Sequence, residues 1–193
     1  MNTENVLFEV KNINKHFGPT HANKDISMTL KRGELHGLVG ENGSGKSTLI
    51  SIIAGINQAD SGEMFMNGQP YKPESPLDAA KHDIGFVVQE LGLLDALPVA
   101  SNMFLGHFKQ FTTAGVLRLR KMYQAAEKQL QRWGFSDISV RAQAGLLTVE
   151  KRKIIEIVKA LLVDPQLLIL DETTQALSHD TRTRLHEIIN ELL

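Results

Sequence analysis

The stretch from Gly40 to Ser47, GENGSGKS, matches the pattern G-x-x-x-x-G-K-[ST] in full. Glycines allow successive backbone N–H groups to turn inward around phosphate oxygens, and a helix that follows directs the positive end of its dipole at the same anion. Lys46 would place a charge between the β- and γ-phosphates, and the Ser47 hydroxyl would ligate Mg²⁺. The alternative is a chance match, expected about once in a hundred chains of this length.

A second candidate site closes the apolar stretch LLILDE, which ends in Asp171 and Glu172. An apolar run of this kind suits a strand buried on both faces of a parallel sheet. Asp171 at the strand end would hold Mg²⁺ directly or through water, and Glu172 would polarise the attacking water. A buried strand ending in a solvated acidic pair is the alternative, but the phosphate loop favours the metal and catalytic roles.

Two further side chains have more open roles. Gln89 ends a strand-like run, and its amide would ligate Mg²⁺ or orient water, although an ordinary strand-end glutamine fits composition as well. Phe17 would stack on an adenine ring, unless it is a core aromatic. We expect Glu172 and Gln89 to be catalytic, and Ser47, Gln89 and Asp171 to ligate the metal. The expected nucleotide-binding residues are Phe17, Gly40, Glu41, Asn42, Gly43, Ser44, Gly45, Lys46, Ser47 and Thr48.

Strands and a helix must position the loop. Apolar alternation and turn residues predict strands on both sides of it, and apolar residues at helical spacing predict a helix after it. The expected elements are a strand at 6–17, two strands within 25–39 around the turn at Arg32-Gly33, a helix from Lys46, a hairpin at 61–72 with Asn67-Gly68 at its turn, and a strand at 84–88.

Beyond residue 89 the pattern becomes helical. Apolar residues from Met122 to Trp133 recur at spacings of three and four, and Gly134 follows where a helix C-cap would be. A second helix is expected at 149–163, and the strand LLILDE and a helix at 179–193 follow. We therefore predict an α/β core at 1–89 and 160–193, incomplete at its C-terminal end, with a helical subdomain at 90–159.

Composition bounds the function. The chain has 193 residues, a formal net charge of −1 and no cysteine, so bulk charge does not favour nucleic acid and Cys-ligated metals are excluded. The seven histidines show no metal-ligand spacing. The N-terminus lacks the pattern of a signal peptide, and the apolar runs are too short to span a bilayer. Any association with a membrane is therefore expected to go through a partner.

Taken in order, the segments GENGSGKSTL, QADSGEMFMNGQP, VVQE, LLILDE and DETTQALS resemble an ATP-binding-cassette (ABC) ATPase over essentially the whole chain. The resemblance is closest to the ATPases of carbohydrate importers of the ribose and galactose type. It implies a P-loop NTPase core with an antiparallel β subdomain and a helical insert. In that subfamily a polypeptide often carries two cassettes in tandem, of which this chain would be part of the first.

The resemblance also implies a mechanism. ATP and Mg²⁺ would bind where two cassettes close head to tail, and hydrolysis would reset a pair of transmembrane permease subunits at the cytoplasmic face of the membrane. A sugar-binding protein outside the membrane would act indirectly, and nucleic acid would not be a partner. The helical insert around 90–110 would receive the permease. The signature stretch, which faces the partner's ATP, would be Leu147, Thr148, Val149, Glu150 and Lys151.

Four departures from the family pattern matter. Glu150 stands where the signature has glycine, and a carboxylate there would repel the partner's phosphates unless Lys151 or Arg152 offsets it. Thr173 replaces a proline and should loosen the turn after Glu172. Ser178 replaces the usual D-loop aspartate. The switch histidine and the last core strands do not occur, which should expose a sheet edge and an apolar helix face.

Three functions remain open from the sequence. The leading hypothesis is the ATPase subunit of a sugar ABC importer. The second is a nucleotide-binding module that regulates or scaffolds without hydrolysis, because the signature is altered. The third, a soluble ABC ATPase acting on nucleic acid, has no support from the neutral charge.

Overall fold

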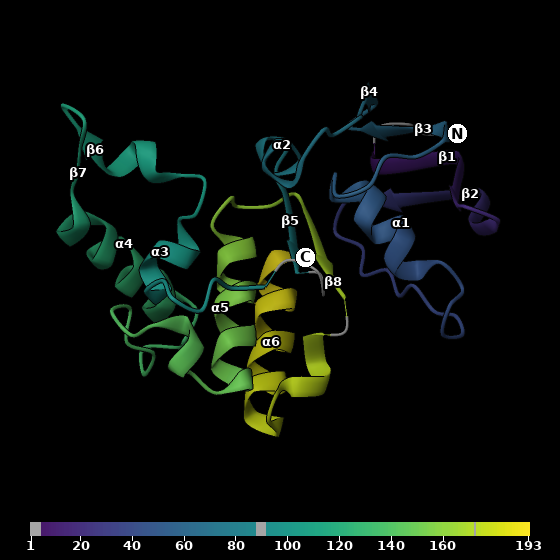
Figure 1. The fold of residues 1–193 in the computed structure, drawn as a ribbon. Helices are drawn as coiled ribbons and strands as arrows, with labels where there is room; N and C mark the ends of the chain where they lie inside the picture. The colour runs from purple at the N-terminus through teal and green to yellow at the C-terminus, as the bar shows by residue number, and fades with distance from the viewer. Residues whose placement is uncertain (1–4, 88–91, 172) are drawn as a thin grey trace.

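The computed structural model describes residues 5–87, 92–171 and 173–193. An antiparallel sheet with strand order β2-β1-β3-β4 lies at one end of the molecule (Figure 1). The turn between the last two strands is made by Asn67 and Gly68, which both have positive φ, so the predicted hairpin is confirmed. The strands are β1 (Val6–Phe17), β2 (Thr20–Lys31), β3 (Ser61–Met66) and β4 (Gln69–Pro70).

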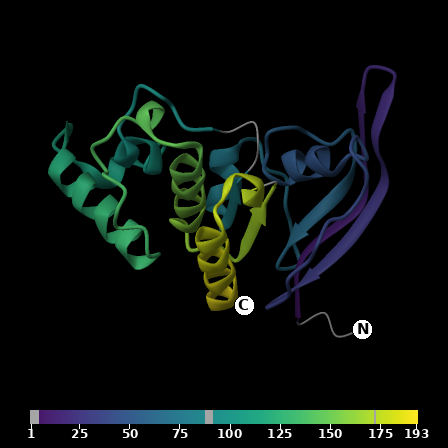
Figure 2. The same ribbon diagram turned by 90° about the horizontal axis from the view of Figure 1, so that it is seen from below.

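Helix α1 (Lys46–Ile53) follows the predicted phosphate loop and packs against this sheet (Figure 2). Its apolar face shares one hydrophobic core with the inward side chains of β1 and β3. The buried Tyr71 closes the end of the helix, because its hydroxyl donates a hydrogen bond to the carbonyl oxygen of Ile53 at 2.6 Å. The sheet and Tyr71 therefore hold α1, and with it the loop, in place. The residues of α1 in the core are Leu49, Ile52 and Ile53.

A parallel pair of strands forms the centre. β5 (Ile84–Val87) pairs in parallel with β8 (Leu167–Leu170), as the sequence predicts for an α/β core. Helix α2 (Pro76–Lys81) leads into β5. Gly85 permits close packing here, because an added Cβ would lie 2.3 Å from the carbonyl oxygen of Ala160.

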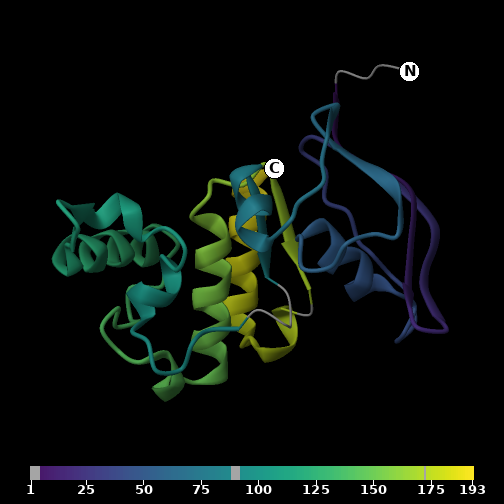
Figure 3. The same cartoon turned by 45° about the horizontal axis from the view of Figure 1, so that its top comes forward.

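Helices make up the rest of the described chain. In Figures 2 and 3, α5 and α6 lie between the central strands and a group of helices at the far end that contains α3 and α4. All four helices contribute to a second hydrophobic core. The predicted division at residues 90 and 160 stays a prediction. The elements are α3 (Val99–Met103), η2 (Phe108–Phe111), β6 (Thr112–Thr113), β7 (Val116–Leu117), α4 (Leu119–Arg132), η3 (Ala144–Leu146), α5 (Val149–Leu161), η4 (Thr173–Ala176) and α6 (His179–Leu192).

Two strand predictions need correction. Residues 34–39 do not form the predicted second strand: they have no regular secondary structure, and Val39 is 92% exposed. A strand needs a hydrogen-bonded neighbour, and no described strand pairs with this segment. β8 is only half-buried at all four positions, because among the described residues it pairs with β5 alone. The expected exposed sheet edge is thereby confirmed.

Candidate nucleotide-binding site

The glycine loop leads directly into α1. Gly45 occupies the N-cap position with φ 87°, a left-handed conformation that glycine adopts without strain, and no side chain caps the helix. The first N–H groups of α1 are therefore left to bind an anion, and the helix dipole favours negative charge at the same point. This geometry fits the phosphates of a nucleotide.

The C-terminal end of the loop, at Gly45, packs against β2. A Cβ added at Gly45 would lie 2.1 Å from the carbonyl oxygen of Ala22 and 2.6 Å from Nδ2 of Asn23. Asn23 is buried, and its Nδ2 donates a hydrogen bond to the carbonyl oxygen of Gly45 at 3.0 Å. Asn23 thus positions the loop. This role of Asn23 was not predicted from the sequence. The available signal was a polar side chain within a strand, but nothing local indicated its partner.

Lys46 curls back over the loop. Its Nζ donates hydrogen bonds to the carbonyl oxygens of Gly40 and Glu41, both at 2.8 Å. The ammonium therefore lies over the loop that is predicted to hold the phosphates, and Ser47 follows it in the first turn of α1. The cradle, the open helix end and one cation together suit a triphosphate.

Asp171 follows the last residue of β8. Its backbone N–H donates to the carbonyl oxygen of Val87 at 2.9 Å, which continues the parallel ladder to the strand ends. Asp171 and Lys46 line the same cavity, so two of the predicted site residues from distant parts of the chain are brought together. Gln89 and Glu172 lie outside the described residues.

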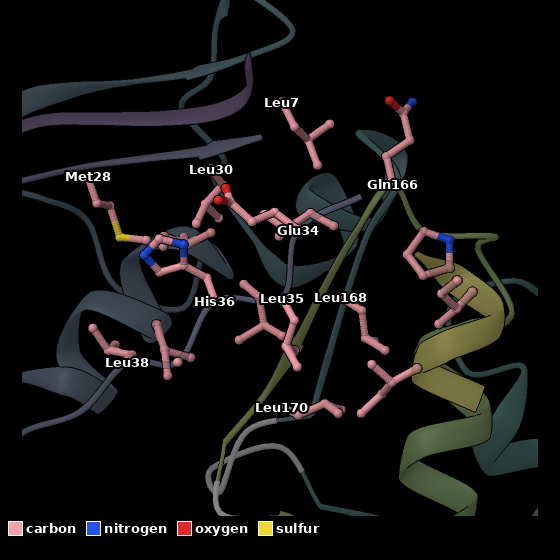
Figure 4. A pocket seen from close by; sticks show the side chains of 18 of the residues that line it. Leu7, Met28, Leu30, Glu34, Leu35, His36, Leu38, Gln166, Leu168 and Leu170 are labelled. Carbon is pink, nitrogen blue, oxygen red and sulfur yellow. The ribbon is translucent and has the colours of Figure 1, made fainter. Parts of the chain in front are cut away.

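The cavity between them has a volume of about 470 Å³ and is mostly apolar (Figure 4). Leu35 and Leu38, from the segment before the loop, face Leu168 and Leu170 of β8 across it. Helix α6 contributes its last apolar residues to the lining. Because such a lining cannot solvate a polyanion, we expect phosphates at the Lys46 end and not among the apolar side chains. The residues of α6 in the lining are Ile189 and Leu192.

Phe17 lies at the end of β1 and is 48% exposed, so it is not the core aromatic that was the alternative. The Nζ of Lys15 lies 5.4 Å from the centre of its ring. An exposed ring with a cation near its face is available for stacking. That Phe17 contacts adenine stays a prediction.

The signature stretch begins helix α5. Thr148 is the N-cap, and its hydroxyl oxygen accepts a hydrogen bond from the backbone N–H of Lys151 at 3.3 Å. Glu150 lies in the first turn and is half-buried. Its Oε1 accepts hydrogen bonds from the backbone N–H of Ser178 at 2.9 Å and from the hydroxyl of Thr181 at 2.6 Å.

These contacts set the charge state of Glu150. The donors supplied by Ser178 and Thr181 hold the pKa of its carboxyl down to about 2, so it stays ionised below pH 4.5, where an ordinary glutamate would be protonated. The charge of Lys151, which also pairs with Asp137, contributes less to lowering this pKa, and Arg152 pairs with Asp95. Sequence reasoning identified Glu150 as unusual but did not identify its partners.

A glycine loop that opens a helix, together with a parallel strand leading to Asp171, defines an α/β cassette of the nucleotide-binding type. The ABC transporter family model matches residues 23–175. The chain belongs to the ABC transporter family, as the sequence motifs predicted.

Curated relatives are similar over nearly all of this chain. A ribose import ATP-binding protein of Agrobacterium fabrum is 40% identical over 187 residues, which are 97% of this chain and 36% of that protein. Another from Bacillus subtilis is 38% identical over 185 residues, 95% of this chain and 37% of that protein. The chain thus spans little more than a third of the length of these relatives.

Solved structures confirm the fold. The structure of cbiO1 from Clostridium perfringens, part of an ABC transporter complex, has a TM-score of 0.72 and 28% identity, and covers 98% of this chain and 76% of that one. A dimeric ATP-binding cassette in a post-hydrolysis state has a TM-score of 0.79 at 23% identity, covering 96% of this chain and 82% of that one. No helix among the described residues is long and apolar enough to cross a membrane.

Proposed function

We propose that this chain is an ATP-binding and ATP-hydrolysing cassette that energises a sugar importer. The observation that carries the proposal is the loop at the start of α1, with a left-handed Gly45, no side-chain cap and Lys46 folded over the loop carbonyls. That arrangement binds phosphate groups through backbone N–H donors and one cation. The names of the curated relatives support ribose or a similar sugar as the cargo of the whole protein.

The site residues divide the work. The backbone N–H groups of the loop would hold the phosphates, and Lys46 would leave its two carbonyl partners to contact them. Oxygen ligands suit Mg²⁺, so the Ser47 hydroxyl and the Asp171 carboxylate would hold that ion, which supplies charge neutralisation on the phosphates when bound. Glu172 would accept a proton from the attacking water, and Gln89 would orient that water. Phe17 would stack on the adenine.

Partners follow from the same proposal. A second cassette would close over the ATP, and its phosphates would meet the signature stretch. Permease subunits would respond to the closing and reopening of the two cassettes, and a sugar-binding protein would deliver the sugar to them. The cassette would therefore act as a peripheral protein at the cytoplasmic face of the membrane. Residues 1–89 with 160–193 would form the nucleotide-binding unit, and 90–159 the part that meets the permease.

Titration with a fluorescent ATP analogue tests the binding step. We expect Lys46→Ala to weaken binding by about tenfold to a hundredfold, because a hydrogen bond to a charged group contributes about 1.5–3 kcal/mol. Lys128→Ala is the matched control, since it removes a lysine from the exposed face of α4. Equal affinity in the two variants would contradict the assigned site.

Turnover is tested in the full-length protein reconstituted with its permease in liposomes. Permease-stimulated ATP hydrolysis, lost in Glu172→Gln, is the expected result. Retained ATP binding with no stimulated hydrolysis would favour the non-hydrolysing regulatory cassette instead.

A further inference from the structure

The Glu150 carboxylate joins two helices that are far apart in sequence. It extends from the first turn of α5 to the N-terminus of α6, where one oxygen, Oε1, accepts hydrogen bonds from both the Ser178 N–H and the Thr181 hydroxyl. We refer to Glu150, Ser178 and Thr181 as the clasp.

The side-chain hydroxyls of Ser178 and Thr181 form a chain of hydrogen bonds that ends at the Glu150 carboxylate. Ser178 is the N-cap of α6, and its hydroxyl oxygen accepts from the Thr181 N–H at 3.3 Å while its hydroxyl donates to Thr181 Oγ1 at 3.0 Å. Thr181 Oγ1 in turn donates to Glu150. Two donors, the Ser178 N–H and the Thr181 hydroxyl, point at the carboxylate, and the N-terminal, positive ends of the α5 and α6 dipoles lie beside it. A negative charge at this point is therefore stabilised inside the chain.

The identity of residue 178 is part of the arrangement. Serine and aspartate are equally good N-caps. An aspartate at 178, however, would bring a second carboxylate next to Glu150, and like charges at such a separation repel. The small neutral hydroxyl of Ser178 caps α6 without placing a second negative charge beside Glu150. The glutamate at 150 and the serine at 178 are thus a matched pair.

We propose that Glu150 is a positioning residue that fastens the signature stretch to the start of α6, so that Leu147–Lys151 and Thr173–Ser178 move as one unit when the cassette meets its partner. The functional part rests on the proposed function, in which these stretches face the partner's ATP. The clasp also directs Oε1 toward α6. The charge of the Glu150 carboxylate is therefore stabilised by hydrogen-bond donors of this chain and does not face the partner's phosphates directly.

Hydrogen exchange in the full-length protein tests the contact itself. In Glu150→Ala, we expect the Ser178 amide to exchange about tenfold faster, because it loses its acceptor. Glu150→Gln retains an amide oxygen and should restore part of the protection. Glu127→Ala, at an exposed position on α4, is the control and should leave exchange at Ser178 unchanged. Unchanged exchange in Glu150→Ala would overturn the clasp.

A double-mutant cycle tests the pairing of residues 150 and 178. Ser178→Asp alone should speed exchange around the start of α6 and lower kcat of the permease-coupled ATPase by about tenfold, with KM for ATP little changed. In the Glu150→Gln background, Ser178→Asp should be harmless, because the repelling charge is gone. An equal defect in both backgrounds would overturn the positioning role. If the wild type bound no ATP, the proposed function would fail, and the exchange experiment would still decide the clasp.

Discussion

Replacement of Gly45 by alanine tests the physical basis of the loop. Two costs apply at this position. The residue has φ 87°, where an L-amino acid pays about 1–2 kcal/mol. The added Cβ would also lie 2.1 Å from the carbonyl oxygen of Ala22, well inside the ordinary contact distance of about 3.5 Å.

The steric clash of the added Cβ is the cost that affects phosphate binding. Ala22 belongs to β2, whose backbone is held by the sheet, so the loop must move by about 1 Å or more. Overpacking of this kind typically costs about 1–3 kcal/mol, which gives a total loss of stability of about 2–5 kcal/mol. Displaced N–H donors no longer converge on the phosphates, and we expect ATP affinity to fall by about a hundredfold.

Gly43→Ala separates the two costs. Gly43 has a similar φ of 81°, but an added Cβ would meet nothing within 4 Å. This variant should lose only the backbone cost of about 1–2 kcal/mol and should bind ATP almost as well as wild type. Urea unfolding and titration with a fluorescent ATP analogue measure both quantities. Equal losses of ATP affinity in the two variants would refute the reasoning, because steric displacement by Cβ would then not matter.

Three further predictions follow from individual contacts. Asn23→Ala should cost about 1 kcal/mol in urea unfolding and weaken ATP binding, because Gly45 loses the amide that positions it. Tyr71→Phe should cost about 0.5–1.5 kcal/mol by the same measurement while ATP affinity is kept, since the hydroxyl bonds the end of α1 and not the loop. Glu150 has a folded-state pKa lowered from 4.5 to about 2, so its contribution to stability is complete above pH 4.5 and is lost as the pH falls toward 2. The difference in unfolding free energy between wild type and Glu150→Gln should therefore shrink between pH 5 and pH 2, and a constant difference would contradict the assignment.

Local signals predicted most of the elements. The glycine loop, the helix from Lys46 and the Asn67-Gly68 turn each depend on residues within a few positions of one another, and the structure confirms all three. Gly134, with φ 85°, likewise follows the end of α4 where the sequence indicated. Such features are encoded by backbone preference and side-chain reach over one turn.

Predictions about strands were less secure where they depended on a second element that pairs with or covers the strand. The segment 34–39 has strand-like residues, yet a strand forms only when another strand accepts its hydrogen bonds, and none of the described strands does so. The half-buried state of β8 has the same cause. Alternation in sequence shows which residues can face a core, but it does not show whether a covering element is present.

The sequence by itself determined the family, the phosphate loop and the fold class, because these depend on a short ordered motif and on hydrophobic periodicity. Only the tertiary structure decided what Asn23 and Glu150 do. Asn23 lies 22 residues from Gly45, and Glu150 lies 28 residues from Ser178, so neither contact leaves a local pattern. A carboxylate that looked like a repelling charge in the sequence is, in the folded chain, an acceptor held between two helix N-termini, because folding brings donors to it that sequence separation conceals.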